Sequence, residues 1–244
     1  MNRIRCNDPQ DLGRRAAGHT ARLLREAVAG RGRARLLVST GASQFTLFEA
    51  LVQEDVDWTK VTMFHLDEYI GMPETHPASF VKYLKERFTS KVPLAAAHFI
   101  DGMGDVDRVI RDITRKIREA PVDVGLIGIG ENAHIAFNDP PADFEDQDAY
   151  KVVTLNEACR RQQLGEGWFP TLEDVPRQAI SMTVRQILQC GHILCAVPYK
   201  VKAQAIYDTF AAKEITPMVP ATALRLHGDV TVYVDPDSAA LLEA

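Results

Sequence analysis

The sequence lacks the features of a membrane, secreted or nucleic-acid-binding protein. No stretch of its 244 residues approaches the ~18 apolar residues that a membrane span needs, and its first residues hold no apolar signal core. Its 28 basic residues are outnumbered by 33 acidic ones, and no basic cluster offers nucleic acid a footprint. We therefore expect a soluble cytoplasmic protein with no nucleic-acid and no membrane partner.

Cysteine is scarce as well. The four cysteines are Cys6, Cys159, Cys190 and Cys195. They show no paired short spacing of the kind found in zinc or redox sites, and the histidines show no metal-ligand pattern. In a reducing compartment we expect free thiols that fill space, and no metal site.

What the sequence does contain is a regular alternation of apolar, β-rich runs and helical patterns. Strands are predicted at 35–39, 61–66, 122–129, 192–197 and 230–234. Helices are predicted at 9–28, 43–51, 77–88, 107–118 and 200–211. This order is typical of parallel strands joined by crossover helices, and residues 1–244 contain no linker, so we expect a single α/β domain.

One segment departs from the alternation. Residues 140–176 are rich in Asp, Gln, Gly and Pro and show only short periodic pieces. A long, weakly structured insert in a compact domain is often a lid or a binding loop. We expect this segment to be a lid.

Three clusters of polar or small residues directly follow predicted strands. They are Thr40-Gly41-Ala42-Ser43, Asp67-Glu68-Tyr69, and Gly128 through His134. Ligands of open parallel sheets bind beyond the carboxyl ends of the strands, so the shared position of these clusters predicts one site.

The first cluster suits phosphate, because small residues let the backbone approach a ligand and the first N–H groups of a helix attract anions. It lacks the Gly-Lys-Ser/Thr of a P-loop and the glycines of a dinucleotide fingerprint. The alternative is a tight turn in which Ser43 caps the next helix.

The second cluster places two adjacent carboxylates after a buried strand. Adjacent side chains of an extended chain face opposite ways, so only one of Asp67 and Glu68 is expected to face a ligand. A carboxylate in a dry site has the basicity to remove a carbon-bound proton. The alternative is a capping Asp beside a surface Glu.

The third cluster ends in His134, followed by Asp139, which is close enough in sequence to orient the ring or to share a proton with it. Lys202 follows the strand at 192–197, where its ammonium can meet a phosphate. The alternatives are a structural histidine and an exposed helical lysine.

Together these residues resemble the glucosamine-6-phosphate deaminase family. The most specific parts of the resemblance are three ordered motifs. They are Phe64-His65-Leu66-Asp67-Glu68-Tyr69-Ile70-Gly71, His76-Pro77-Ala78-Ser79-Phe80, and Gly130-Glu131-Asn132-Ala133-His134-Ile135-Ala136-Phe137-Asn138-Asp139-Pro140. The resemblance implies a three-layer α/β/α fold with a mainly parallel, Rossmann-like sheet. It also implies conversion of glucosamine 6-phosphate to fructose 6-phosphate and ammonia, without metal or organic cofactor.

The resemblance also implies roles. Asp67 takes the place of the base that moves a proton between C2 and C1, and His134 that of the histidine that opens the sugar ring. An arginine belongs in the phosphate site, and Arg160 or Arg161 is the candidate. The predicted catalytic residues are Asp67, His134, Asp139 and Glu131. The predicted substrate-binding residues are Thr40, Gly41, Ala42, Ser43, Glu68, Asn132, Arg160, Arg161 and Lys202.

The chain departs from the best-studied branch of that family, which has Asp-Gly where this chain has Asn132-Ala133. Asn cannot exchange a proton, so the carboxylate that supports His134 must be Asp139, Glu131 or neither. Two alternatives stay open: a 6-phosphogluconolactonase-type hydrolase, and a sugar-phosphate sensor without turnover. The hexosamine substrate is unresolved between glucosamine and galactosamine 6-phosphate, and a homo-oligomer is compatible with the sequence.

Overall fold

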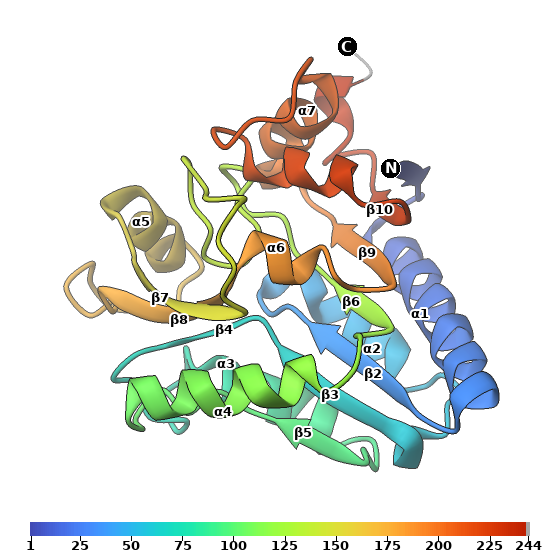
Figure 1. The fold of residues 1–244 in the computed structure, drawn as a ribbon. Helices are drawn as coiled ribbons and strands as arrows, with labels where there is room; N and C mark the ends of the chain where they lie inside the picture. The colour runs from blue at the N-terminus through green and yellow to red at the C-terminus, as the bar shows by residue number, and fades with distance from the viewer. Residues whose placement is uncertain (243–244) are drawn as a thin grey trace.

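Seven parallel strands form the central sheet of the computed structural model, which describes residues 1–242 (Figure 1). Their spatial order is β1-β10-β9-β6-β2-β3-β5, and every neighbouring pair is parallel. The strands are β1 (Asn2–Arg5), β2 (Ala34–Val38), β3 (Val61–His65), β5 (Ala96–His98), β6 (Val124–Leu126), β9 (His192–Val197) and β10 (Val230–Val234). Five of them were predicted from their apolar runs; β1 and β5 were not.

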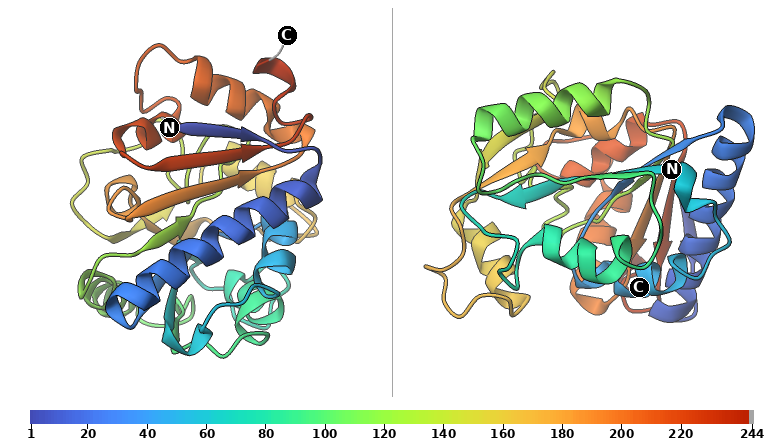
Figure 2. Two further views of the ribbon diagram at one scale, coloured as in Figure 1. Left: turned by 90° about the vertical axis from the view of Figure 1, so that its right-hand side faces the viewer. Right: turned by 90° about the horizontal axis from the view of Figure 1, so that it is seen from below.

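Helices cover both faces of this sheet, which confirms the predicted three-layer α/β/α fold. Along β2 the side chains alternate, with Leu36 and Val38 in one apolar core and Leu37 in the other. The first core also contains residues of α1 (Pro9–Arg31), α2 (Phe45–Leu51) and α3 (Phe80–Leu84). The second contains residues of α4 (Val106–Arg118), α6 (Val184–Ile187) and α7 (Ala203–Ala211). Figure 2 shows α1 lying across one face of the sheet.

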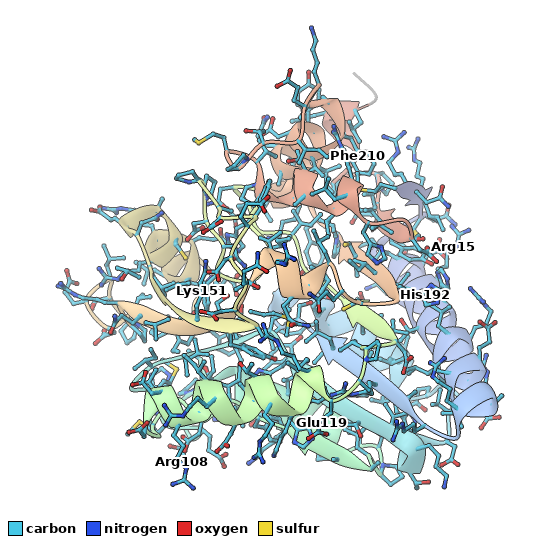
Figure 3. All side chains as sticks on the ribbon, viewed as in Figure 1. Arg15, Arg108, Glu119, Lys151, His192 and Phe210 are labelled. Carbon is cyan, nitrogen blue, oxygen red and sulfur yellow. The ribbon has the colours of Figure 1, made fainter. Side chains whose placement is uncertain are left out.

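Local signals set the helix ends. Asp8 caps α1 by accepting the backbone N–H of Asp11 at 2.7 Å, and Pro9 occupies the first turn. Gly32, with φ of 70°, ends the helix in the left-handed conformation. The helix predicted at 77–88 is shorter at its start: Ser79 caps α3, and a π-helix over Lys85–Thr89 continues it. Arg108 of α4 and Glu119, the residue after its last turn, point outward (Figure 3).

A second, antiparallel sheet lies beside the first. Its order is β4 (Asp67–Tyr69), β8 (Gln178–Met182) and β7 (Tyr150–Thr154). With α5 (Glu157–Gly165) it encloses a third apolar core that includes Tyr69, Phe137 and Phe169. The expectation that 140–176 is weakly structured was therefore wrong, because β7 and α5 lie within it. Only Tyr150 of β7 is fully buried, so this strand has no run of buried apolar residues.

Within residues 1–242, no helix combines the length and the apolar character that a membrane span requires.

Candidate active site

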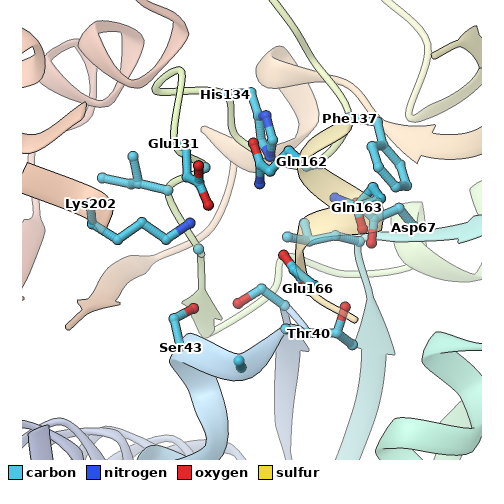
Figure 4. A pocket seen from close by; sticks show the side chains of 18 of the residues that line it. Thr40, Ser43, Asp67, Glu131, His134, Phe137, Gln162, Gln163, Glu166 and Lys202 are labelled. Carbon is cyan, nitrogen blue, oxygen red and sulfur yellow. The ribbon is translucent and has the colours of Figure 1, made fainter. Parts of the chain in front are cut away.

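The three predicted clusters meet at the carboxyl ends of the central strands, around a cavity of about 140 Å³ (Figure 4). Residues 39–43 follow β2, Asp67 follows β3, and residues 128–134 follow β6. Helix α5 and the turn before α7 close the remaining sides. The clusters therefore lie together, as their shared position after parallel strands predicted.

Asp67 presents an unsupported carboxylate to this cavity. Its side chain is 7% exposed, and no residue from 1 to 242 donates a hydrogen bond to it. Burial, with a further contribution from the charge of Glu68, raises the pKa of Asp67 to about 8. A carboxyl group with a pKa near neutrality and a free face toward a cavity is suited to take and return a proton.

Glu68 was predicted to bind substrate, and the structure corrects this. Its side chain turns away from the cavity and accepts hydrogen bonds from Ser79 Oγ at 2.8 Å and from the N–H of Val81 at 2.9 Å. Two further backbone N–H groups, of Tyr69 and Phe80, also donate to it. Glu68 therefore anchors the start of α3, as the opposite orientation of adjacent strand residues requires.

His134 and Asp139 form a hydrogen-bonded pair, with 3.1 Å between Nδ1 and Oδ1. Burial alone would raise the pKa of Asp139, but the hydrogen bond and charge of His134 and the amide of Asn132 outweigh it and lower that pKa. An ionised Asp139 can only accept, so the ring proton lies on Nδ1 and Nε2 is free. The structure thus places Asp139, rather than Glu131, beside His134.

The turn that carries His134 depends on a close approach. A Cβ on Gly130 would lie 2.2 Å from Nε2 of His134, so only glycine leaves space for the ring. The N–H of Gly130 donates to the carbonyl of His134 at 2.9 Å and closes the turn. Ala133 has φ of 64°, a left-handed conformation in which glycine would be unstrained.

Asn132 was predicted to bind substrate, but it is not among the residues that line the cavity. Its amide Nδ2 donates to Asp139 Oδ1 at 2.9 Å, and its Oδ1 accepts the N–H of His134 at 3.2 Å. Glu131, its neighbour, does line the cavity.

The predicted phosphate loop lines the cavity with all four of its residues, Thr40 through Ser43. Gly41, with φ of 100°, precedes a 3₁₀ turn over Ala42–Gln44, and the hydroxyl of Tyr83 donates to its carbonyl at 2.9 Å. Ser43 lies inside that turn and caps nothing, so the alternative of a serine N-cap is wrong.

Lys202 is the one lysine or arginine that lines the cavity among residues 1–242. It is 8% exposed, so the alternative of an exposed helical lysine is wrong. Burial lowers the pKa of Lys202, while the nearby charges of Glu166 and Glu131 oppose that shift. In Figure 4 its ammonium points into the cavity.

Arg160 and Arg161 do not line the cavity, which corrects their predicted role. Arg160 donates to the carbonyls of Leu172 and Val175, so it braces the loop that follows α5. Arg161 pairs with Glu157 on the exposed side of the same helix. Neither the helix that carries these arginines nor the direction of their side chains was predicted from the sequence.

The residues of α5 and of its C-cap that do line the cavity were missed. They are Gln162, Gln163 and Glu166. Gln163 accepts a hydrogen bond from the buried hydroxyl of Tyr69 at 2.6 Å. The available signal was a helix with Asn156 as its N-cap and polar residues at spacings of three and four on its inner face.

Glu166 brings a further carboxyl group into the cavity (Figure 4). Burial raises its pKa, and the charges of Lys202 and His134 oppose that rise. The acidic groups Asp67, Glu131 and Glu166 thus share the cavity with a single lysine. Within residues 1–242, no group of three or more His, Cys, Asp or Glu side chains is placed to hold a metal ion.

Comparison with known proteins gives three findings. Residues 7–233 match the family model of glucosamine-6-phosphate isomerases and 6-phosphogluconolactonases. A glucosamine-6-phosphate deaminase of Oenococcus oeni is 35% identical over 206 residues, which cover 84% of this chain and 85% of that protein. Among solved structures, a monomeric glucosamine-6-phosphate deaminase is 30% identical with a TM-score of 0.90, covering 99% of this chain and 100% of the other.

The lactonase side of this family is more distant. A 6-phosphogluconolactonase from Thermotoga maritima has a TM-score of 0.78 at 16% identity, covering 96% of this chain and 98% of the other. At that identity the likeness shows a shared fold and nothing further.

Proposed function

The chain belongs to the family of glucosamine-6-phosphate isomerases and 6-phosphogluconolactonases, and on that premise we propose that it converts glucosamine 6-phosphate to fructose 6-phosphate and ammonia. The observation that carries the proposal is Asp67, a bare carboxylate with a pKa of about 8 that faces the same cavity as His134. The reaction is an isomerisation followed by hydrolysis, so the enzyme is a hydrolase.

His134 begins the reaction by exchanging protons with oxygen atoms of the cyclic sugar through Nε2, which opens the ring. Asp67 then removes the proton from C2, next to the aldehyde carbon, while the aldehyde oxygen takes up a proton, and an enolamine with a hydroxyl at C1 and the amine at C2 forms. Returning the C2 proton to C1 leaves a protonated imine at C2. Water adds to the imine and ammonia leaves, so one water molecule is consumed for each ammonia released.

The phosphate of the substrate is bound at the other end of the cavity. Thr40, Gly41, Ala42 and Ser43 offer backbone N–H groups and hydroxyls, and Lys202 offers the charge. No arginine lines the cavity within residues 1–242, so Lys202 is the principal cation for this phosphate.

Segment 140–176 is proposed to close over bound substrate. Helix α5 and its C-cap Glu166 place three polar side chains in the lining of the cavity, and the N-cap Asn156 is exposed. Hydrogen exchange measured with and without fructose 6-phosphate tests this closure. Equal protection of α5 in both states would identify it as a fixed wall.

The residues proposed for catalysis and for phosphate binding line one cavity of a single chain, and the oligomeric state remains to be measured. We place this enzyme as a single domain in the cytoplasm, where phosphorylated sugars are metabolised. A measured mass in solution and the location of the tagged protein in cells test these two statements.

One assay separates the proposed deaminase from the two alternatives. The purified protein is supplied with glucosamine 6-phosphate, galactosamine 6-phosphate and 6-phosphogluconolactone, and ammonia release, lactone hydrolysis and binding are followed in parallel. We expect ammonia from an amino sugar phosphate. Lactone hydrolysis without ammonia, or binding without any turnover, would refute the proposal.

A further inference from the structure

Asn132 makes two hydrogen bonds that a carboxylate at its position could not both make. Its Oδ1 accepts the backbone N–H of His134, and its Nδ2 donates to Asp139 Oδ1. Chemistry fixes the orientation of this amide, because a backbone N–H only donates and an ionised carboxylate only accepts. Since Asp139 Oδ1 also meets Nδ1 of His134, the side chains of Asn132 and Asp139 and the backbone and imidazole of His134 form a closed hydrogen-bonded loop.

Asn132 does not line the cavity, so any effect it has on the reaction passes through Asp139 and His134. This is the arrangement of a group that orients a catalytic residue. Asp139 Oδ1 accepts hydrogen bonds from both Asn132 Nδ2 and His134 Nδ1. Of these two donors, only the amide of Asn132 never changes its charge.

We propose that Asn132 is a positioning residue that keeps Asp139 ionised and aimed at His134, which holds the imidazole proton on Nδ1 and leaves Nε2 for the sugar. The inference rests on the proposed deaminase function. An amide suits the position because it supplies a donor without a charge. A carboxylate there would stand beside Asp139, and two carboxylates in one site bind a shared proton.

Other charged groups act on this pair and stay in place in every variant considered. Glu131, Glu166 and Lys202 surround the cavity into which His134 faces. From α5, the thiol of Cys159 contacts Asp139 as a further hydrogen-bonding partner.

The test uses Asn132→Asp and Asn132→Ala, with Asn156→Asp as the matched control. Asn156 also accepts a backbone N–H, from Cys159 at 2.8 Å, but its amide has no carboxylate partner among the described residues, and Asp serves equally well as a helix N-cap. Two quantities are measured for each protein. One is the pH titration of the His134 ring by NMR in the free protein, assigned with His134→Gln. The other is the pH dependence of kcat and KM for ammonia release.

We expect Asn132→Asp to move the titration of the His134 ring upward by about one pH unit, because a second acidic group favours the charged ring. The rising limb of kcat against pH should move in the same direction. Asn132→Ala should lower kcat by about tenfold with little change in KM, since the imidazole of His134 loses its orientation while the residues that line the cavity stay the same. Asn156→Asp should change neither quantity.

The exchanged pair Asn132→Asp with Asp139→Asn adds a stricter test. The double variant again has one carboxylate and one amide in the hydrogen-bonded loop, so the titration of His134 should return toward its position in the wild-type protein. The proposal would be overturned if Asn132→Asp left both the titration of His134 and the pH profile of kcat as in the wild-type protein. A rise in KM without a fall in kcat in Asn132→Ala would also overturn it. Because the NMR titration needs no substrate, an absence of ammonia release would refute the deaminase function and still leave this result readable.

Discussion

Asp67 and Asp139 are residues of the same type in opposite surroundings. Asp67 is buried without a hydrogen-bond donor from residues 1–242, and its pKa rises to about 8. Asp139 lies at a tight turn with an imidazole and an amide directed at it, and its pKa falls. The first is thereby equipped to move a proton and the second to hold a charge. The donors around a carboxyl group, more than its burial, decide which of these it does.

The largest effect should come from removing the base. Asp67→Asn keeps the shape of the side chain but cannot accept a proton, and a positioned base typically contributes ~10²–10⁴-fold to its step. We expect loss of ammonia release together with loss of exchange between the C2 hydrogen and solvent, followed by NMR in deuterated water. In the original protein, kcat/KM should rise with pH up to about 8, where Asp67 ionises.

A normally folded Asp67→Asn that still exchanges the C2 hydrogen at the original rate would show that Asp67 is structural. His134→Gln is the comparison, because a defect in ring opening should leave some exchange from open-chain sugar.

The same substitution should reveal the energetic cost of the bare carboxylate. The pKa of Asp67 is higher in the folded than in the unfolded chain, so its contribution to stability is complete below about pH 4 and is lost as pH rises to about 8. Each unit of pKa shift corresponds to ~1.4 kcal/mol. We expect the free energy of unfolding of Asp67→Asn, relative to the original protein, to increase by several kcal/mol across this range, measured by urea unfolding.

Above about pH 8 the difference should be constant. A difference that does not vary with pH would mean that Asp67 is ionised throughout, and the contrast with Asp139 would disappear.

A smaller effect is expected at the other carboxylate. Asp139→Asn leaves a hydrogen-bonding side chain next to His134 but removes the charge that fixes its tautomer. We expect kcat for the cyclic substrate to fall on the order of 10–100-fold, within the range that a poised acid or base supplies, while C2 exchange of open-chain sugar persists. Equal losses in both measurements would mean that Asp139 supports the fold of the site and not the ring-opening step.

The smallest effect concerns Glu166, which shares features of Asp67 and of Asp139. Burial raises its pKa as for Asp67, yet cationic groups act on it as on Asp139. Its carboxylate opposes the binding of a second anion beside Lys202, so Glu166→Gln should tighten binding of fructose 6-phosphate by roughly 3- to 10-fold. Calorimetry at pH 8 provides the measurement, with neutral fructose as the control ligand. Weaker binding would show that Glu166 instead accepts hydrogen bonds from the sugar.

The sequence predicted the central strands of the parallel sheet better than the edge strand β1 and the helix α5 beside the cavity. Strands such as β9 and β10 are apolar runs bounded by turn residues, and these patterns reflect burial on both faces. Strand β1 is an edge strand of mostly polar residues, so it has no such pattern. Helix α5 buries Cys159 and Gln163 rather than an apolar stripe, which is why its periodicity was not seen.

Within the site, Asp67, His134 and Lys202 were correctly expected to share one cavity because strand order alone determines which loops meet. Glu68 and Arg160 were placed there wrongly, since side-chain direction depends on packing that sequence spacing does not reveal. The neutral amide at position 132 looked like a defect in sequence. The hydrogen bonds of Asn132 give it a partner on each side.

The pairing of β1 with β10 has a consequence for synthesis of the chain. Arg3 lies opposite Val232, so the ribosome makes β1 long before its one neighbour in the central sheet exists. An unpaired strand edge is a template for joining other chains, and charged side chains are a common protection against that. Arg3 and Arg5 place such charges on β1, the strand that is made first and pairs with the strand made last. The polarity that hid β1 from pattern recognition is therefore suited to keeping the nascent chain from aggregating.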